Sequence, residues 1–451
     1  MTKDPVAAST SRRLLASLAR AQSRGRLPSV VAGLVRDGEP VWFGSYGAPA
    51  VPGHDPLDVQ YRIGSITKTM TAVLVLQMVR DGRLGLDDAV SVVLGDLAGH
   101  AYAASTVRTL LAHSSGMQSE PTGSWWERTA GLSFADLMAA NDGTGAVFDA
   151  HDRFHYSNLG YAVLGEVAAR LLGTTWWDAV RERVLAPLGM SRTSYLPEAA
   201  AAQGWSVHPY DATLTVEPAT DTRAMAPAGQ VWATVTDLST YAAFLGRGHD
   251  DVLSGEELAA AFAPQSGTPE DGLRSGHGLG FQLFAGGSGT LAGHTGSMPG
   301  FLATVLVDRP RRTGGVVLAN ATTGFSPAEC VIGLLEELER CEPTLTEPWR
   351  PTDSVPAELA GVPGVWHWGN TPVVFAMEGD ELVGLRNGVE AYRFVVRDGR
   401  VVGRTGYHAG EELHVVRRPD GSVGHLEAAT FVYTRTPYDP EAPVPGGAPG
   451  R

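Results

Sequence analysis

The order in which strand and helix periodicities follow one another is the strongest constraint on the fold of this chain. Strand patterns at residues 30–47 and 278–319 enclose residues 65–245, where the periodicity is mostly helical. Helices are expected at about residues 9–24 and from Ser326 to Cys341. Because strands must bury their apolar faces together, this order predicts one antiparallel sheet assembled from both ends of a domain, with a helical insert between them.

The C-terminal part of the chain has a different pattern. A proline-rich segment follows the last predicted helix, and beyond it only short strand patterns occur, with Asp398-Gly399 at one of the turns. About 80 residues of short strands fit a small antiparallel barrel. The predicted boundaries are 1–341 for a first domain, 342–357 for a linker, 358–436 for the barrel and 437–451 for a flexible tail.

Composition excludes several classes of function. The net charge is -14 and no basic block interrupts it, so nucleic-acid binding is disfavoured. We expect no membrane span, because no run of 18 apolar residues occurs. We expect a cytoplasmic protein, because the first thirty residues lack a secretion signal.

Cys330 and Cys341 lie about 16 Å apart on one predicted helix, too far for a disulfide. We expect no cofactor and no metal, including at His151 and His155.

The use of lysine singles out one residue. Of the 35 basic residues only Lys3 and Lys68 are lysine, and Lys3 lies in the N-terminal tail. Lysine can be neutralised by its surroundings, whereas arginine stays charged. Lys68 therefore indicates proton transfer, and the alternative is an ordinary surface lysine.

Ser65 and Lys68 form the only S-x-x-K motif that this chain contains. Three residues apart at the start of a predicted helix, the two side chains share one face. A neutral amine there can remove the hydroxyl proton as the serine attacks, and the helix N-terminus can stabilise an oxyanion. No G-x-S-x-G occurs, so an α/β-hydrolase nucleophile elbow is not the competing interpretation.

Two further motifs follow in the sequence. Tyr156 and Asn158 stand ahead of a predicted helix, where residues two apart in an extended loop face the same way. Tyrosine can relay a proton and asparagine can hold a substrate amide; the alternatives are a core tyrosine and an asparagine that caps the helix. In the segment from His294 to Ser297 the imidazole could orient a carboxylate or assist a proton relay, and a structural histidine is the alternative.

Six segments follow one another in order over about residues 25–340: YRIGSITKTMTA, LLAHSSGM, HYSNLGYAVLG, LAPLGM, MAPAGQVWATVTDLSTYAAFL and GHTGSMPGF. In these segments the chain resembles the serine β-lactamases and penicillin-binding proteins, especially the class C, DD-peptidase and esterase branch. The resemblance implies a β-lactamase/transpeptidase-like α/β (α+β) domain. It makes Ser65 the acylated nucleophile, Lys68 its base partner, Tyr156 a proton shuttle and Asn158 a contact to the acyl amide. The backbone N–H groups of Ser65 and Ser297 would form the oxyanion hole.

His294 departs from the family pattern, because it occupies the place of the third-motif lysine. A histidine is mostly neutral near pH 7 and holds a substrate carboxylate less firmly, so β-lactamase activity is less expected.

The predicted barrel makes the chain similar to the stand-alone penicillin-binding-protein-type thioesterases of actinobacterial nonribosomal peptide pathways, typified by the surugamide cyclase, which carry a small lipocalin-like barrel. This implies a peptidyl thioester substrate on a carrier protein, with a D-residue at the acylated end, released as a macrolactam. The acidic net charge counts mildly against a carrier-protein partner. The alternative is a cytoplasmic serine hydrolase, such as an esterase, a D-aminopeptidase or a DD-carboxypeptidase-like enzyme, that releases a linear acid.

Three more residues are candidate substrate contacts. Trp125 and Trp126 could line an acyl pocket, or belong to a surface loop that packs on itself. Arg435, at the end of the last predicted strand, could present a cation to the substrate. The alternative for Arg435 is a surface ion pair with an acid such as Asp439.

Overall fold

The computed structural model describes residues 6–267, 274–286, 289–345 and 348–438. The chain divides into two compact units, Met1–Thr344 and Leu345–Arg451, and the break falls inside the predicted linker. The predicted flexible tail falls almost wholly outside the described residues, as does Asp439.

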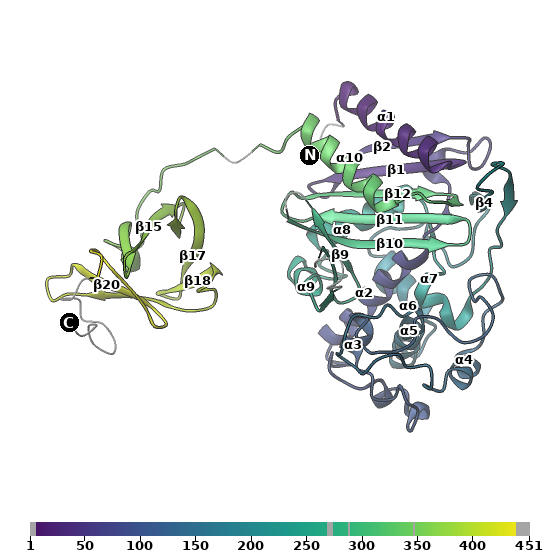
Figure 1. Cartoon of the computed structure of the whole chain (residues 1–451), viewed down its shortest axis with the longest axis horizontal. Helices are drawn as coiled ribbons and strands as arrows, with labels where there is room; N and C mark the ends of the chain where they lie inside the picture. The colour runs from purple at the N-terminus through teal and green to yellow at the C-terminus, as the bar shows by residue number, and fades with distance from the viewer. Residues whose placement is uncertain (1–5, 268–273, 287–288, 346–347, 439–451) are drawn as a thin grey trace. The chain divides into compact units, whose positions relative to one another are not determined.

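The first unit is built on an eight-stranded antiparallel sheet whose strands come from both ends of the unit (Figure 1). Val31 of the first strand pairs with Leu318 of the last long strand, so strands from the two ends of the unit are neighbours in one sheet, as predicted. The turn between the first two strands is Asp37-Gly38, and both residues have positive φ, as a two-residue hairpin requires. In sheet order the strands are β2 (Glu39–Gly47), β1 (Ser29–Arg36), β12 (Thr313–Ala319), β11 (Phe301–Asp308), β10 (Gly289–Met298), β9 (Gln282–Gly286), β8 (Ser275–His277) and β7 (Ser266–Gly267).

Helices cover both faces of this sheet. On β1, Val30, Ala32 and Leu34 join the core beneath α1 (Ala8–Gly25) and α10 (Pro327–Cys341). Val31 and Val35 join the core on the other face, which contains α8 (Val235–Arg247) and the helical insert. Strand alternation therefore divides the apolar residues between two cores.

The helical insert places α2 (Thr67–Arg80) in the centre of the unit, where its residues are buried nearly all around. A helix that is apolar on every side must lie inside a domain. The other helices of the insert and of the segment after it are α3 (Val107–Leu111), α4 (Phe134–Ala140), α5 (Asn158–Leu172), α6 (Trp176–Val180), α7 (Ala226–Gly229) and α9 (Gly255–Ala261). Two small sheets accompany them: β3 (Tyr61–Arg62) with β6 (Trp232–Ala233), and β13 (Ala321–Thr322) with β4 (Trp205–Val207) and β5 (Leu214–Val216).

The second unit is an antiparallel barrel of eight strands around a core that contains Trp366, Phe375 and Phe394. The two end strands approach each other through a bridge between Val402 and Glu412, so the barrel is nearly closed. In sheet order the strands are β18 (Arg400–Gly406), β17 (Val389–Arg397), β16 (Glu381–Arg386), β15 (Thr371–Glu378), β14 (Gly364–Trp368), β21 (Phe431–Thr434), β20 (Val423–Ala428) and β19 (Leu413–Arg417).

The predicted fold class is confirmed: a β-lactamase/transpeptidase-like α/β domain is followed by an all-β barrel of the lipocalin-like kind. The sequence analysis does not predict β14 or the two small sheets, whose strands are too short to show a period. Within the described part of the chain, no helix has the length and hydropathy needed to cross a bilayer.

Candidate active site

Ser65 lies in a 3₁₀ turn, Gly64–Ile66, that leads directly into α2. Gly64 has φ +55°, and a Cβ at this position would lie 2.6 Å from the backbone nitrogen of Ser297. A Cβ on Gly296 would lie 1.9 Å from the carbonyl oxygen of Ile63. The two glycines therefore let β10 lie against the turn, which brings the backbone of Ser297 beside that of Ser65.

Lys68 is fully buried one turn later on α2. Its Nζ donates to Ser65 Oγ over 3.0 Å and to the carbonyl oxygen of Ala228 over 2.6 Å. Burial lowers the pKa of Lys68 from 10.5 to about 7, although the charges of Glu120 and Glu127 oppose the shift. At neutral pH a large fraction of this amine is uncharged, so it can accept the serine proton.

Tyr156 packs between Lys68 and a buried histidine. The Nζ of Lys68 lies 5.0 Å from the centre of the tyrosine ring, and the ring of His113 stacks on it at 4.2 Å. Burial raises the pKa of Tyr156 above its ordinary value of 10, while a hydrogen bond with Ser65 opposes the shift. The phenol therefore keeps its proton and can donate it to a group that leaves the acyl carbon as the ester on Ser65 forms.

Asn158 is the first residue of α5 and does not cap it. Ser157 is the N-cap, because its hydroxyl accepts from the N–H of Gly160; the alternative of an asparagine cap is wrong. Asn158 Nδ2 instead donates to the Glu120 carboxylate over 2.6 Å. The buried Oδ1 of Asn158 has no partner among the described residues, which leaves it able to accept from a substrate amide.

Glu120 is a member of this site that the sequence analysis does not identify. Besides Asn158, its carboxylate accepts from Trp126 Nε1 over 2.6 Å. Glu127 follows in the same loop, half-buried, and burial raises the pKa of its carboxyl group. The only sequence signal is position, because Glu120 comes three residues after the end of the LLAHSSGM segment in a stretch without periodicity.

His294 is buried on β10, and its Nδ1–H donates to the carbonyl oxygen of Thr295 over 2.5 Å. The Nε2 atom has no partner among the described residues. Burial above all, and then His277 and Lys68, hold the pKa of His294 well below its ordinary value of 6.5. The site therefore carries no fixed cation at this position near neutral pH.

One cavity of about 510 Å³ is lined by three of the predicted catalytic residues, whereas Lys68 and Asn158 are not among its lining residues. Ser65, Tyr156, His294 and Ser297 line it together, opposite the first residues of α10. Its volume suits a small molecule or the reactive end of a longer one. The serine, the amine, the phenol and two backbone N–H groups thus form an arrangement able to perform acyl transfer.

The other predicted substrate contacts are placed differently. Trp126 is buried and reaches the site through Glu120, whereas Trp125 is 59% exposed, donates to Glu127 and lies under the guanidinium of Arg128. Neither tryptophan is among the described residues that line the Ser65 cavity. The loop that carries the two tryptophans packs partly on itself, which is the alternative to an acyl pocket given in the sequence analysis.

Arg435 is engaged within its own barrel. Its guanidinium donates to the carbonyl oxygens of Gly361 and Val365 and lies 3.8 Å from the ring centre of Trp366. This structural role is one that the sequence analysis does not consider. A substrate contact of Arg435 stays a prediction.

Comparison with known proteins identifies the family. The model of the Beta-lactamase family matches residues 14–334, and a domain of unknown function, DUF7586, matches residues 355–435. Beta-lactamase-like protein 2 of Dictyostelium discoideum is 27% identical over 307 residues, which are 64% of this chain; the match spans 55% of that relative's length.

Two solved structures are similar as well. The D-stereospecific amidohydrolase from Streptomyces sp. is 26% identical, with a TM-score of 0.60, and the match covers 73% of this chain and 98% of that one. SurE with D-Leu is 25% identical, with a TM-score of 0.59, and covers 95% of this chain and 100% of that one. The chain belongs to the beta-lactamase family of penicillin-binding-protein-like serine hydrolases.

Proposed function

We propose that this chain is an acyl-transfer enzyme that works through an ester on Ser65. The observation that carries the proposal is the contact of 3.0 Å between Ser65 Oγ and the buried amine of Lys68. Lys68 takes the hydroxyl proton as Oγ attacks the acyl carbonyl, and the N–H groups of Ser65 and Ser297 stabilise the oxyanion. The proton passes through Tyr156 to the leaving thiol or amine as its bond to the acyl carbon breaks.

The charges of the site favour a neutral acyl donor. His294 is uncharged where the family pattern has a lysine, so a substrate carboxylate finds no fixed cation there. The free Oδ1 of Asn158 suits the amide N–H of a peptidyl group. A D-residue at the acylated end is supported by the similarity to a D-stereospecific amidohydrolase and to SurE, whose structure was determined with D-Leu.

The acceptor in this proposal is the N-terminal amine of the same peptide. Its attack on the acyl-serine releases Ser65 and closes a macrolactam from a peptidyl thioester that a carrier protein delivers in the cytoplasm. The similarity to SurE supports this assignment, because it spans 95% of the chain and so includes most of the barrel. The stand-alone thioesterases that the sequence resembles have the same two-domain order.

Glu120 favours a second candidate, a hydrolase of D-amino acid amides. Its carboxylate lies 2.6 Å from Asn158 Nδ2, beside the atom assigned to the acyl group's nitrogen. A free D-amino acid amide has an ammonium group at that position, which the carboxylate would pair with. A peptidyl group has an uncharged amide there instead.

Two kinds of substrate, a pair of epimeric peptidyl thioesters and an amino acid amide, separate the candidates. A peptidyl N-acetylcysteamine thioester with a D-residue at its C-terminal end is offered beside its L-epimer, and D-phenylalanine amide is offered separately. Mass spectrometry should show an adduct on Ser65 and a ring from the D-epimer. Linear acid from the thioester together with rapid hydrolysis of the amide would establish the second candidate.

Ser65→Ala should abolish the adduct, whereas Ser45→Ala, which removes an exposed hydroxyl on β2, should keep it. An adduct that persists in Ser65→Ala would refute both candidates.

A further inference from the structure

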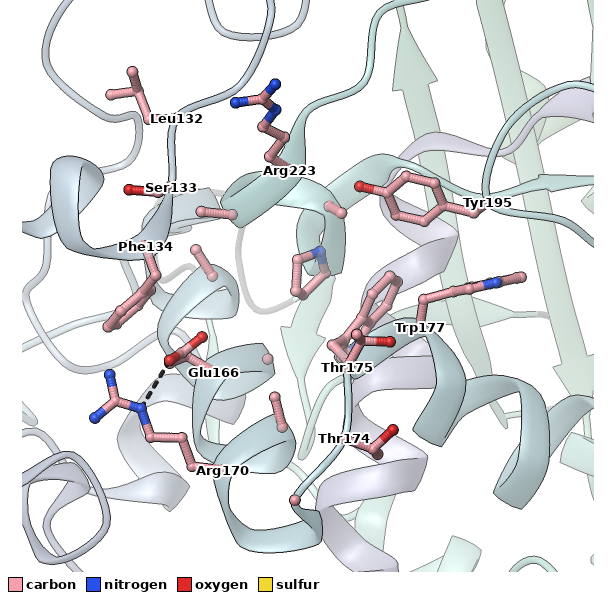
Figure 2. A pocket seen from close by; sticks show the side chains of 18 residues that line it. Leu132, Ser133, Phe134, Glu166, Arg170, Thr174, Thr175, Trp177, Tyr195 and Arg223 are labelled. Atoms are coloured by element: carbon pink, nitrogen blue, oxygen red, sulfur yellow. Dashed lines mark hydrogen bonds and ion pairs between the residues drawn. The ribbon is translucent and has the colours of Figure 1, made fainter.

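A second, larger pocket of about 750 Å³ lies within the helical part of the first unit, and it shares no lining residue with the Ser65 cavity. We refer to it as the α5–α7 pocket. Figure 2 shows its lining side chains, which come from the segment before α4, from α5 and α6, and from the segment that enters α7. Its volume lies in the range of sites that bind small molecules.

Small side chains on α5 create this space. Ala162, Gly165 and Ala169 line the pocket from successive turns of the helix, where leucines would fill it. Gly165 also has to be small, because a Cβ there would lie 2.1 Å from Cγ of Pro227. The small side chains therefore leave a pocket that opens to solvent and has the size of a small-molecule site.

The walls of the pocket are mainly apolar and aromatic. Phe134 lies on one side and Trp177 on another (Figure 2), and Trp176 also lines the pocket. The charged pair Glu166 and Arg170 is already satisfied, because Arg170 Nε donates to Glu166 over 2.7 Å, as the dashed line in Figure 2 marks. The body of a ligand that fits these walls is therefore apolar.

One cation at the rim is free. Arg223 lines the pocket with an exposed side chain, and its guanidinium has no hydrogen-bond or ion-pair partner among the described residues. Its backbone has φ +45°, a region that residues other than glycine and asparagine rarely adopt, and its N–H is held by Asp221. The backbone of Arg223 is therefore fixed, while its side chain is exposed, and an unpaired forked guanidinium at the mouth of an apolar pocket suits a carboxylate.

The floor of the pocket touches the catalytic lysine through one short helix. Ala226 and Pro227 of α7 line the pocket, and the next carbonyl, that of Ala228, accepts from Lys68 Nζ over 2.6 Å. Thr71, one turn after Lys68, donates to the carbonyl oxygen of Pro227 over 3.0 Å and accepts from Trp176 Nε1 over 3.1 Å. A ligand that presses on α7 or Trp176 therefore acts on the carbonyl that orients Lys68.

We propose that the α5–α7 pocket is a second ligand site, for a small apolar carboxylate, and that its occupancy changes the acylation of Ser65 through α7. The binding half of this proposal does not depend on the proposed function. The coupling half rests on the proposed role of Lys68 and has its own readout.

Octanoate and 1-octanol, which share an apolar chain and differ in charge, are titrated into the full chain by calorimetry. Octanoate should bind about tenfold more tightly, the size expected of a charged hydrogen bond. Arg223→Gln should remove this difference, whereas Arg12→Gln, at an exposed position on α1, should keep it. Ala169→Phe should weaken both probes at least tenfold, whereas Ala260→Phe, at an exposed position on α9, should weaken neither.

Equal affinities of the two probes, or unchanged binding in Ala169→Phe, would overturn the site. For the coupling half, saturating octanoate should change the rate at which a fluorophosphonate labels Ser65 by at least threefold in the wild type and not in Ala169→Phe. Binding without a change in rate would overturn the coupling. A wild type whose Ser65 is never labelled would instead count against the proposed function and leave the binding result standing.

Discussion

Replacing Lys68 by methionine should inactivate the protein and stabilise its fold. Methionine nearly matches the lysine side chain in length and has no ionisable group. The folded structure lowers the pKa of Lys68 from 10.5 to about 7 by burying it. At pH 7 this costs the folded state about 4 kcal/mol, because a tenfold change in a protonation equilibrium is 1.36 kcal/mol.

Removing the amine removes this cost, but part of the resulting stabilisation is lost with its hydrogen bond. The carbonyl oxygen of Ala228 loses the donor that now lies 2.6 Å away, and a buried acceptor without a partner costs about 1 to 3 kcal/mol. The net expectation at pH 7 is that Lys68→Met raises the free energy of unfolding by about 1 to 3 kcal/mol.

The stability difference between Lys68→Met and the wild type should depend on pH, and its direction follows from the pKa of Lys68. Between pH 7 and 10.5 the unfolded chain binds a proton at Lys68 and the folded chain does not, so the stability of the wild type rises with pH in this window. Methionine has no such dependence. The stability of the variant relative to the wild type should therefore fall by about 3 kcal/mol from pH 7 to pH 9.5, which removes or reverses its advantage.

Urea unfolding followed by circular dichroism at 222 nm measures this difference, because the α-helices of the described residues all lie in the first unit. Lys3→Met, which removes the other lysine of the sequence, is the matched control and should change neither stability nor its pH dependence. If the difference between Lys68→Met and the wild type is the same at both pH values, Lys68 is charged in the folded protein and cannot be the base.

Four further results are expected. Lys68→Arg should slow acylation of Ser65 by about 10² to 10⁴-fold, and the wild-type rate should rise about tenfold from pH 6 to pH 8 as Lys68 loses its proton; equal stopped-flow rates with an activated ester would contradict the base role. Tyr156→Phe should lower the acyl-transfer rate by about 10²-fold or more, and a loss below threefold would leave Tyr156 a packing residue. Glu120→Gln should slow hydrolysis of D-phenylalanine amide and spare a peptidyl thioester, whereas equal losses would argue against an ammonium contact. Arg435→Ala should destabilise the barrel by about 1 to 2 kcal/mol, because it removes a cation stacked on Trp366 and donors to the barrel's own carbonyls; an unchanged unfolding midpoint followed by tryptophan fluorescence would refute this.

Local signals in the sequence were sufficient for the main elements of the fold. The Asp37-Gly38 and Asp398-Gly399 turns have the positive φ angles that two-residue hairpins need, and Gly173 ends α5 in the left-handed conformation. These features depend on residues within a few positions of one another. The spacing of Ser65 and Lys68 belongs to the same class, because residues three positions apart on a helical turn share a face whatever surrounds them.

The electrostatic properties of the site required the tertiary structure. The pKa of Lys68 depends on burial beneath Ala228, which is 160 residues away in the sequence. Glu120 meets Asn158 because a loop approaches the first residue of α5, 38 positions away, and no period or motif in the sequence indicates such an approach. Arg435 turns to the carbonyls of Gly361 and Val365 for the same reason, since barrel closure brings residues about 70 positions apart into contact. The sequence by itself therefore determined which elements form and which residue types can react, whereas burial and long-range contact, which only the folded chain has, decided their charge and their partners.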